Sequence, residues 1–102
     1  MTSSEQTVVF AELWMQPGRR LELEAAAREA AALLQRQPGF VAGRLLHFRG
    51  GPYFYRYEMT WTDPASWGAF WASDDEAAFR ALFDPWLLRP FTYHVHEVKV
   101  NA

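Results

Sequence analysis

Three of the five tryptophans lie in one short stretch, WTDPASWGAFW, which begins at Trp61 and ends at Trp71. Trp67 and Trp71 are four residues apart, so on a helix they share one face. The segment before Trp61 alternates in type, which brings Tyr55 and Tyr57 to the same side of a strand as Trp61. Aromatic walls with a few polar groups are typical of sites for small molecules. The same rings could instead pack the core, and the sequence leaves both interpretations open.

The histidines are a second group of residues that could do chemistry. His94 and His96 are two residues apart, so a strand would point both to one face, a spacing that also occurs in zinc sites. A third ligand would have to come from His47 or from a carboxylate, and none is supplied locally. We therefore predict no metal site, and expect surface or interface histidines. One of the three could still act as a general base.

Composition excludes several classes of function. The chain has 102 residues, is 50% hydrophobic and 17% aromatic, and carries a net charge of −2 with scattered basic residues, which argues against a nucleic-acid partner. It has no cysteine, and hence no disulfide or thiolate site. No apolar run approaches the ~18–20 residues of a membrane span. The amino terminus lacks the features of a signal peptide, so we expect a cytoplasmic protein with no membrane partner.

The elements that must position these residues follow from periodicity and turn signals. Strands are predicted over 6–15, 40–49, 52–61 and 91–100, and an amphipathic helix over 19–36. Pro38-Gly39 separates that helix from the second strand, and Gly50-Gly51 indicates a hairpin between the middle strands. Arg56 and Glu58, on the polar face of the third strand, are expected to form cross-strand ion pairs.

Two short helices are predicted between the third and fourth strands. Asp63 followed by Pro64 indicates the start of the first helix. The sequence SDDE at 73–76 is a capping box that starts the second, which runs to about Phe83 and places Phe79 on its apolar side.

The order β-α-β-β-α-β, with the second helix broken in two, predicts a ferredoxin-like α+β fold. This fold has an antiparallel four-stranded sheet with helices on one face. The other face is left without helices and must be covered by another chain or a ligand. We therefore expect a homodimer packed sheet to sheet.

Several motifs together resemble the antibiotic biosynthesis monooxygenase family of dimeric α+β barrel proteins. They are the turn Pro38-Gly39-Phe40, the strand YRYEMTW that ends at Trp61, the helix start TDPASW, and Trp71-Ala-Ser73. The resemblance covers about residues 7–100 of a chain that we expect to form one domain over residues 1–102. It implies the fold and dimerisation more specifically than an activity, because the family includes cofactor-independent oxygenases, haem-degrading enzymes and proteins with no established substrate.

The resemblance also implies roles for individual residues. The strand-ending Trp61 lines the substrate cavity of the similar polyketide oxygenases, Trp67 takes the place of a phenol, Tyr57 that of an asparagine, and Arg80 matches a site arginine. For the haem-degrading branch only one of three residues, a tryptophan, is matched.

The resemblance and the aromatic cluster predict a cofactor-independent monooxygenase of a flat, polyketide-like aromatic molecule. Trp61 and Trp67 would hold the ring, Tyr55 and Tyr57 would bind its oxygens, and Arg80 would stabilise the anion. Trp71 and Phe79 are further candidates for the cavity wall. A non-catalytic ligand-binding domain is the alternative, and haem binding is a third reading. The substrate, its turnover, the role of each histidine and assembly beyond a dimer are left open.

Overall fold

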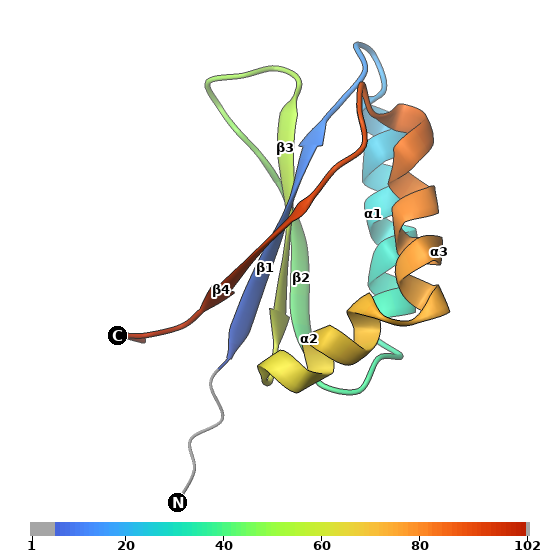
Figure 1. The fold of residues 1–102 in the computed structure, drawn as a ribbon. Coiled ribbons are helices and arrows are strands. Elements are labelled where there is room, and N and C mark those ends of the chain that lie inside the picture. Colours follow the sequence, from blue (N-terminus) through green and yellow to red (C-terminus); the bar gives the residue numbers. More distant parts are fainter. Residues whose placement is uncertain (1–5, 102) are drawn as a thin grey trace, which may run out of the picture.

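The computed structural model describes residues 6–101 and shows a four-stranded sheet with helices on one side of it (Figure 1). The elements in chain order are β1 (Thr7–Trp14), α1 (Arg20–Leu34), β2 (Phe40–His47), β3 (Phe54–Trp61), α2 (Pro64–Trp71), α3 (Asp74–Phe83), a 3-10 turn (Asp84–Trp86) and β4 (Tyr93–Glu97). This confirms the predicted ferredoxin-like α+β fold, and the sheet does not close into a barrel within the chain.

The sheet has the order β2-β3-β1-β4, and all its neighbouring strands are antiparallel. β1 pairs with β3 along its whole length, from Thr7 opposite Trp61 to Trp14 opposite Phe54. β2 and β4 are the edge strands. The last strand is shorter than the predicted 91–100, because β4 pairs with β1 only as far as Glu97.

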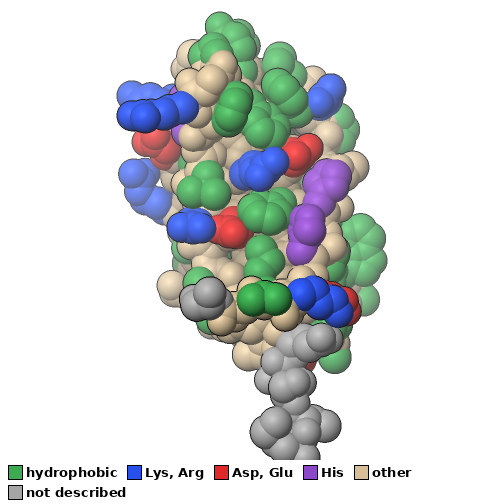
Figure 2. Space-filling view, turned by 90° about the vertical axis from the view of Figure 1, so that its left-hand side faces the viewer, with side chains coloured by type: hydrophobic (Ala, Val, Ile, Leu, Met, Phe, Trp, Pro, Cys, Tyr) green, Lys and Arg blue, Asp and Glu red, His purple; other side chains and the backbone are tan. Residues whose placement is uncertain are grey.

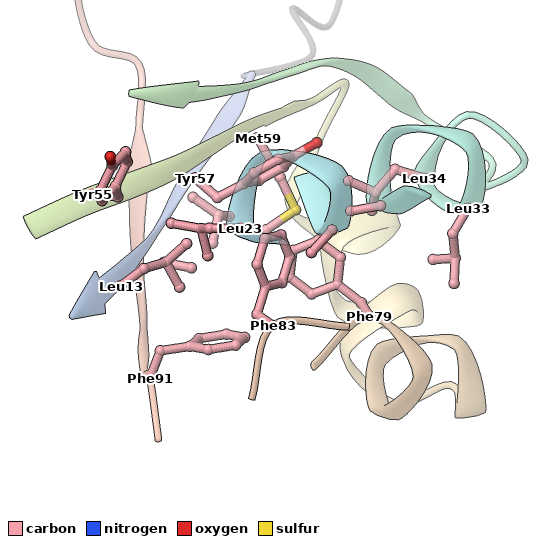
Figure 3. Packing of buried hydrophobic residues seen from close by; sticks show 14 of the residues in the cluster. Leu13, Leu23, Leu33, Leu34, Tyr55, Tyr57, Met59, Phe79, Phe83 and Phe91 are labelled. Atoms are coloured by element: carbon pink, nitrogen blue, oxygen red, sulfur yellow. The ribbon is translucent and has the colours of Figure 1, made fainter. Parts of the chain in front are cut away.

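Alternation along the strands decides what lies in the core. Val9, Ala11 and Leu13 of β1 are fully buried and face the helices. Alternate residues of β3, from Tyr55 to Trp61, are buried on the same side. The helices add Leu23, Ala30 and Leu34 of α1 and Phe79 and Phe83 of α3 (Figure 3). The aromatic side of β3 is therefore the side under the helices.

The opposite side of the sheet, here called the open face, has none of the helices of residues 6–101 over it (Figure 1). Figure 2 shows hydrophobic and charged side chains mixed on this side. Its apolar residues are interspersed with charged pairs: Arg56 lies 3.7 Å from Glu12, and Arg44 of β2 binds Glu58. These pairs confirm the predicted cross-strand contacts. The two histidines of β4 also lie on this face, since His94 pairs with Phe10 and His96 with Val8 in the β1–β4 register.

The predicted turns and helix starts occur where the sequence placed them, but two of them differ in detail. Asp63 caps α2 as predicted, since its carboxylate accepts a hydrogen bond from the Ser66 N–H at 2.8 Å. Ser73 stands at the start of α3, but its hydroxyl donates to the Phe70 carbonyl at 2.7 Å and makes no cap, so the capping box does not form. The glycines of the β2–β3 hairpin have no positive φ, and its loop is longer than the two-residue turn that they suggested.

Gly39, like Gly18, has a positive φ that favours glycine, and Gly39 is also closely packed. Its φ is +82°, and an added Cβ would lie 2.1 Å from the Ser66 hydroxyl oxygen. The chain between α1 and β2 therefore packs directly on the first turn of α2. This contact fixes α2 beside the end of β3.

Candidate functional site

The seven predicted site residues do not line one cavity. They come from β3 (Tyr55, Tyr57, Trp61), α2 (Trp67, Trp71) and α3 (Phe79, Arg80). The structure divides them into an interior pair and two separate openings, at opposite edges of the sheet.

Trp61 and Phe79 form the interior pair, and both are fully buried. The Trp61 ring stacks on Phe70 at 5.2 Å and meets Trp67 at 6.0 Å. Its indole N–H has no hydrogen-bond partner among residues 6–101. Trp61 was predicted to wall a cavity, but in the structure it lies in the core, because α2 packs directly over the end of β3.

The first opening, the α2–α3–β4 pocket, has a volume of about 330 Å³. It is lined by Trp67, Trp71, Arg80, Phe91, Thr92, Tyr93 and Val95. Trp67 is nearly buried, and Trp71 is 54% exposed. Tyr93 was not predicted; it packs edge-on against Trp67 at 4.9 Å and gives the pocket a phenol.

Arg80 is held in this pocket by neighbouring groups. Its guanidinium lies 3.1 Å from the Glu76 carboxylate, donates to the Phe91 carbonyl at 2.7 Å, and stacks on the Phe91 ring at 4.3 Å. The Tyr93 hydroxyl donates to the same carboxylate at 2.7 Å. Burial, and then the hydrogen bond to Glu76, raise the pKa of Tyr93. Arg80 thus anchors the segment that leads into β4 to α3, and Glu76 offsets the charge that was expected to meet a substrate anion.

The second opening, the α1–β2 groove, lies between the helix and the edge strand and has a volume of about 420 Å³. It is lined by Glu24, Ala27, Arg28 and Ala31 of α1, by Gly43, Arg44, Leu45 and His47 of β2, and by Tyr55 and Tyr57 of β3. The two tyrosines reach it because Leu45 and His47 are their register partners on the helix side of the sheet.

The Tyr57 hydroxyl is the distinctive polar group of this groove. Its side chain is 1% exposed, with the ring packed against Phe79 at 5.5 Å and Phe83 at 5.7 Å (Figure 3). The hydroxyl ends 2.9 Å from the point where a Cβ on Gly43 would lie, at the groove. Within residues 6–101 no side chain or carbonyl accepts its hydrogen bond. Burial raises the pKa of Tyr57 to about 12. At neutral pH the group is an O–H donor, as an ordinary tyrosine is.

We expect this burial to make stability fall in alkaline solution. The unfolded chain loses the Tyr57 proton near pH 10, while the folded chain keeps it to about pH 12. The unfolded state then binds fewer protons, so the free energy of unfolding decreases as pH rises through that window. Urea unfolding measured between pH 10 and pH 12 should show this decrease in the free energy of unfolding. The decrease should be smaller in Tyr57→Phe. An equal loss in Tyr57→Phe would contradict the assignment.

His47 lies beside the tyrosines at the groove. Its ring stacks on Tyr55 at 4.4 Å, and its Nε2 lies 3.1 Å from the Gly51 carbonyl. A carbonyl only accepts, so Nε2 carries the proton and Nδ1 of the neutral ring is left with a lone pair. Of the three histidines named as possible bases, His47 is the one placed next to candidate site residues. His94 and His96 lie on the open face, where His94 is 3.5 Å from Glu12.

Charges around the groove are mostly paired. Arg44 binds Glu58, and Glu24 lies 3.2 Å from Arg20. Across the described part of the chain, Arg28 is the groove-lining cation without an ion pair. The groove thus combines a phenol donor, an imidazole acceptor and aromatic rings, which suit deprotonation of a flat molecule and stabilisation of its oxyanion. Residues 6–101 contain no group of three or more His, Asp or Glu side chains placed to hold a metal ion.

Comparisons with known proteins place the fold. The sequence model of the family described as "antibiotic biosynthesis monooxygenase" matches residues 7–82. A structure from Bordetella bronchiseptica that bears the same family name has a TM-score of 0.84 at 22% identity, covering 95% of this chain and 100% of that one. A conserved protein from Methanosarcina mazei has a TM-score of 0.81 at 15% identity, over 95% and 96% of the two chains.

A third similar structure has a named activity. It is a variant of SnoaB, a cofactor-independent oxygenase from Streptomyces nogalater, with a TM-score of 0.74 at 19% identity, covering 97% of this chain and 96% of that one. Among curated proteins, none matches this sequence. The chain belongs to the antibiotic biosynthesis monooxygenase family, because the family match spans most of its length. None of the helices in the described range is long and apolar enough to cross a membrane.

Proposed function

We propose that this protein binds a flat, electron-rich aromatic molecule in the α1–β2 groove and oxygenates it with O₂, without a metal or flavin. The observation that carries the proposal is the Tyr57 hydroxyl, which reaches the groove from a buried ring and has no acceptor in residues 6–101. A hydroxyl donor held in place at a groove, with no acceptor in the protein, is the kind of polar group that fixes the orientation of a small-molecule ligand. The likeness to SnoaB, a cofactor-independent oxygenase, supports the choice of chemistry.

The chemistry follows from the two polar groups. His47 Nδ1 takes a proton from an activated CH₂ of the substrate, and the Tyr57 O–H stabilises the oxygen of the resulting enolate. The enolate passes one electron to O₂, and the substrate radical and superoxide combine through a new C–O bond. The imidazolium returns its proton to the peroxide, which loses water to leave a carbonyl. In sum, CH₂ and O₂ become C=O and H₂O.

Oxygen consumption tests the proposal. An anthrone-type tricyclic phenol, incubated in air with a chelator, should consume O₂ faster with the protein than without it. His47→Gln should reduce the enzymatic part, because glutamine cannot take up the proton. No uptake above the spontaneous rate would contradict the proposed reaction.

A non-catalytic binding domain is the second candidate, and the state of Arg80 favours it. The resemblance implied that Arg80 stabilises a substrate anion. In the structure its charge is instead paired with the Glu76 carboxylate. The protein would then hold its ligand and release it unchanged. Recovery of the intact ligand after aerobic incubation, with binding but no oxygen uptake, would select this candidate.

We also propose that two copies pack through the open face. Phe10, Trp14 and Phe54 place aromatic rings there, and Trp14 is 36% exposed. Figure 2 shows hydrophobic side chains among charged ones on this face. Such a mixed but aromatic-rich surface is typical of protein interfaces. Sedimentation equilibrium should give the mass of a dimer, and a monomer mass at micromolar concentration would overturn this proposal.

A further inference from the structure

Gly43 has no backbone reason to be glycine. Its φ lies outside the positive region that favours glycine, unlike that of Gly39. Glycine also weakens a strand, because it has no side chain to pack and loses more freedom on folding. Gly43 nevertheless stands in the middle of β2. A glycine in a strand interior often marks a place where another group approaches the backbone closely.

The group that approaches Gly43 is the Tyr57 hydroxyl. A Cβ at Gly43 would lie 2.9 Å from that oxygen and 3.1 Å from the Phe40 ring. The first distance is shorter than real Cβ contacts, so a side chain at Gly43 would displace the hydroxyl or cover it. The missing side chain therefore keeps the hydroxyl open to the groove.

The facing wall of the groove is also made of small side chains. Ala27 and Ala31 of α1 are one turn apart and line the groove opposite the β2 backbone. With alanine on one wall and glycine on the other, the passage to the hydroxyl suits a thin object. The nearly buried side chains of Tyr55 and Tyr57 lie at its floor.

We propose that Gly43 determines substrate selectivity by admitting the edge of a flat ring system to the Tyr57 hydroxyl. The substrate enters the α1–β2 groove edge-on, and a carbonyl or phenolate oxygen on that edge accepts the Tyr57 hydrogen bond. Positions flanking this oxygen carry no bulky substituents. The inference rests on the proposed function for the place of the substrate, and it names the substrate class that the site takes.

Anaerobic binding tests this inference without turnover. The probes are anthrone, which presents its oxygen on a flat edge, and a phenol with tert-butyl groups on both sides of its oxygen. Wild type should bind anthrone and not the hindered phenol. Gly43→Ala should weaken anthrone binding by about 10- to 200-fold, the range of one methylene-sized change in a pocket.

Gly68→Ala is the matched control, because a Cβ at Gly68 would have nothing within 4 Å. It should bind anthrone as wild type does. Circular dichroism and thermal unfolding check that each variant folds. If Gly43→Ala failed to fold, the preference of wild type for anthrone over the hindered phenol would still test the inference.

Wild-type affinity in folded Gly43→Ala, or equal binding of the two probes, would overturn the role of Gly43 alone. A wild type that binds neither probe would overturn both that role and the proposed function. Selective binding without oxygen uptake in air would leave the role of Gly43 standing and contradict the proposed reaction.

Discussion

Tyr57→Phe is expected to lower kcat for oxygen uptake by about 10²- to 10³-fold, the usual effect of removing one oxyanion donor. The substitution removes the hydroxyl and keeps the ring that packs against Phe79 and Phe83. KM should change less than kcat, because the charge on the substrate oxygen is largest in the transition state. Initial rates of oxygen uptake at several substrate concentrations separate the two parameters.

Tyr93→Phe makes the same chemical change in the other opening and serves as the control. The Tyr93 hydroxyl donates to the Glu76 carboxylate, so its loss should cost about 1.5–3 kcal/mol of stability. Its kcat should stay close to that of wild type. A larger fall in kcat for Tyr93→Phe than for Tyr57→Phe would move the site to the α2–α3–β4 pocket.

Trp61→Ala should destabilise the fold by about 3–5 kcal/mol, the usual cost of truncating a buried large aromatic side chain. Trp61 is fully buried against Phe70 and Trp67, and the collapse of α2 cannot fill the space of an indole. The free energy of unfolding of a domain is about 5–15 kcal/mol in total, so this substitution would remove much of it. Urea denaturation measures the change directly.

Trp71→Ala is the comparison for this effect. Trp71 is 54% exposed, so its removal should change the free energy of unfolding by much less. If Trp61→Ala kept wild-type stability and lost ligand binding, Trp61 would belong to the site and not to the core. Loss of activity in Trp61→Ala is therefore informative only beside its unfolding curve.

Much of the fold could be predicted from the sequence because local signals agree with it. Alternation in β1 and β3, the amphipathic α1, and Asp63-Pro64 at the start of α2 each act over a few residues. Errors arose where a signal had a competing use. Ser73 turns its hydroxyl back to Phe70, and Glu76, the other half of the expected capping box, binds Arg80 and Tyr93 instead.

The site was harder to predict, because it depends on contacts between distant segments. Alternation shows that Tyr57 and Trp61 share a face, but not which of them reaches an opening. Packing of α2 on β3 buries Trp61, while the small residues of α1 and β2 leave the hydroxyl of Tyr57 accessible. Gly43 could have been noticed as a glycine within a predicted strand. Its contact with Tyr57 could not, because Met59 is its register partner and the Tyr57 side chain reaches it diagonally.

The contact between Trp67 and Tyr93 has a consequence for how relatives of this protein are sorted. The resemblance implies a phenol at position 67, and an alignment column there records tryptophan and scores the group as lost. In three dimensions a phenol is present, delivered to the same ring by a strand that lies more than twenty positions later in the chain. A comparison made position by position therefore misses this phenol, while one made by the atoms that meet in space records it beside Trp67.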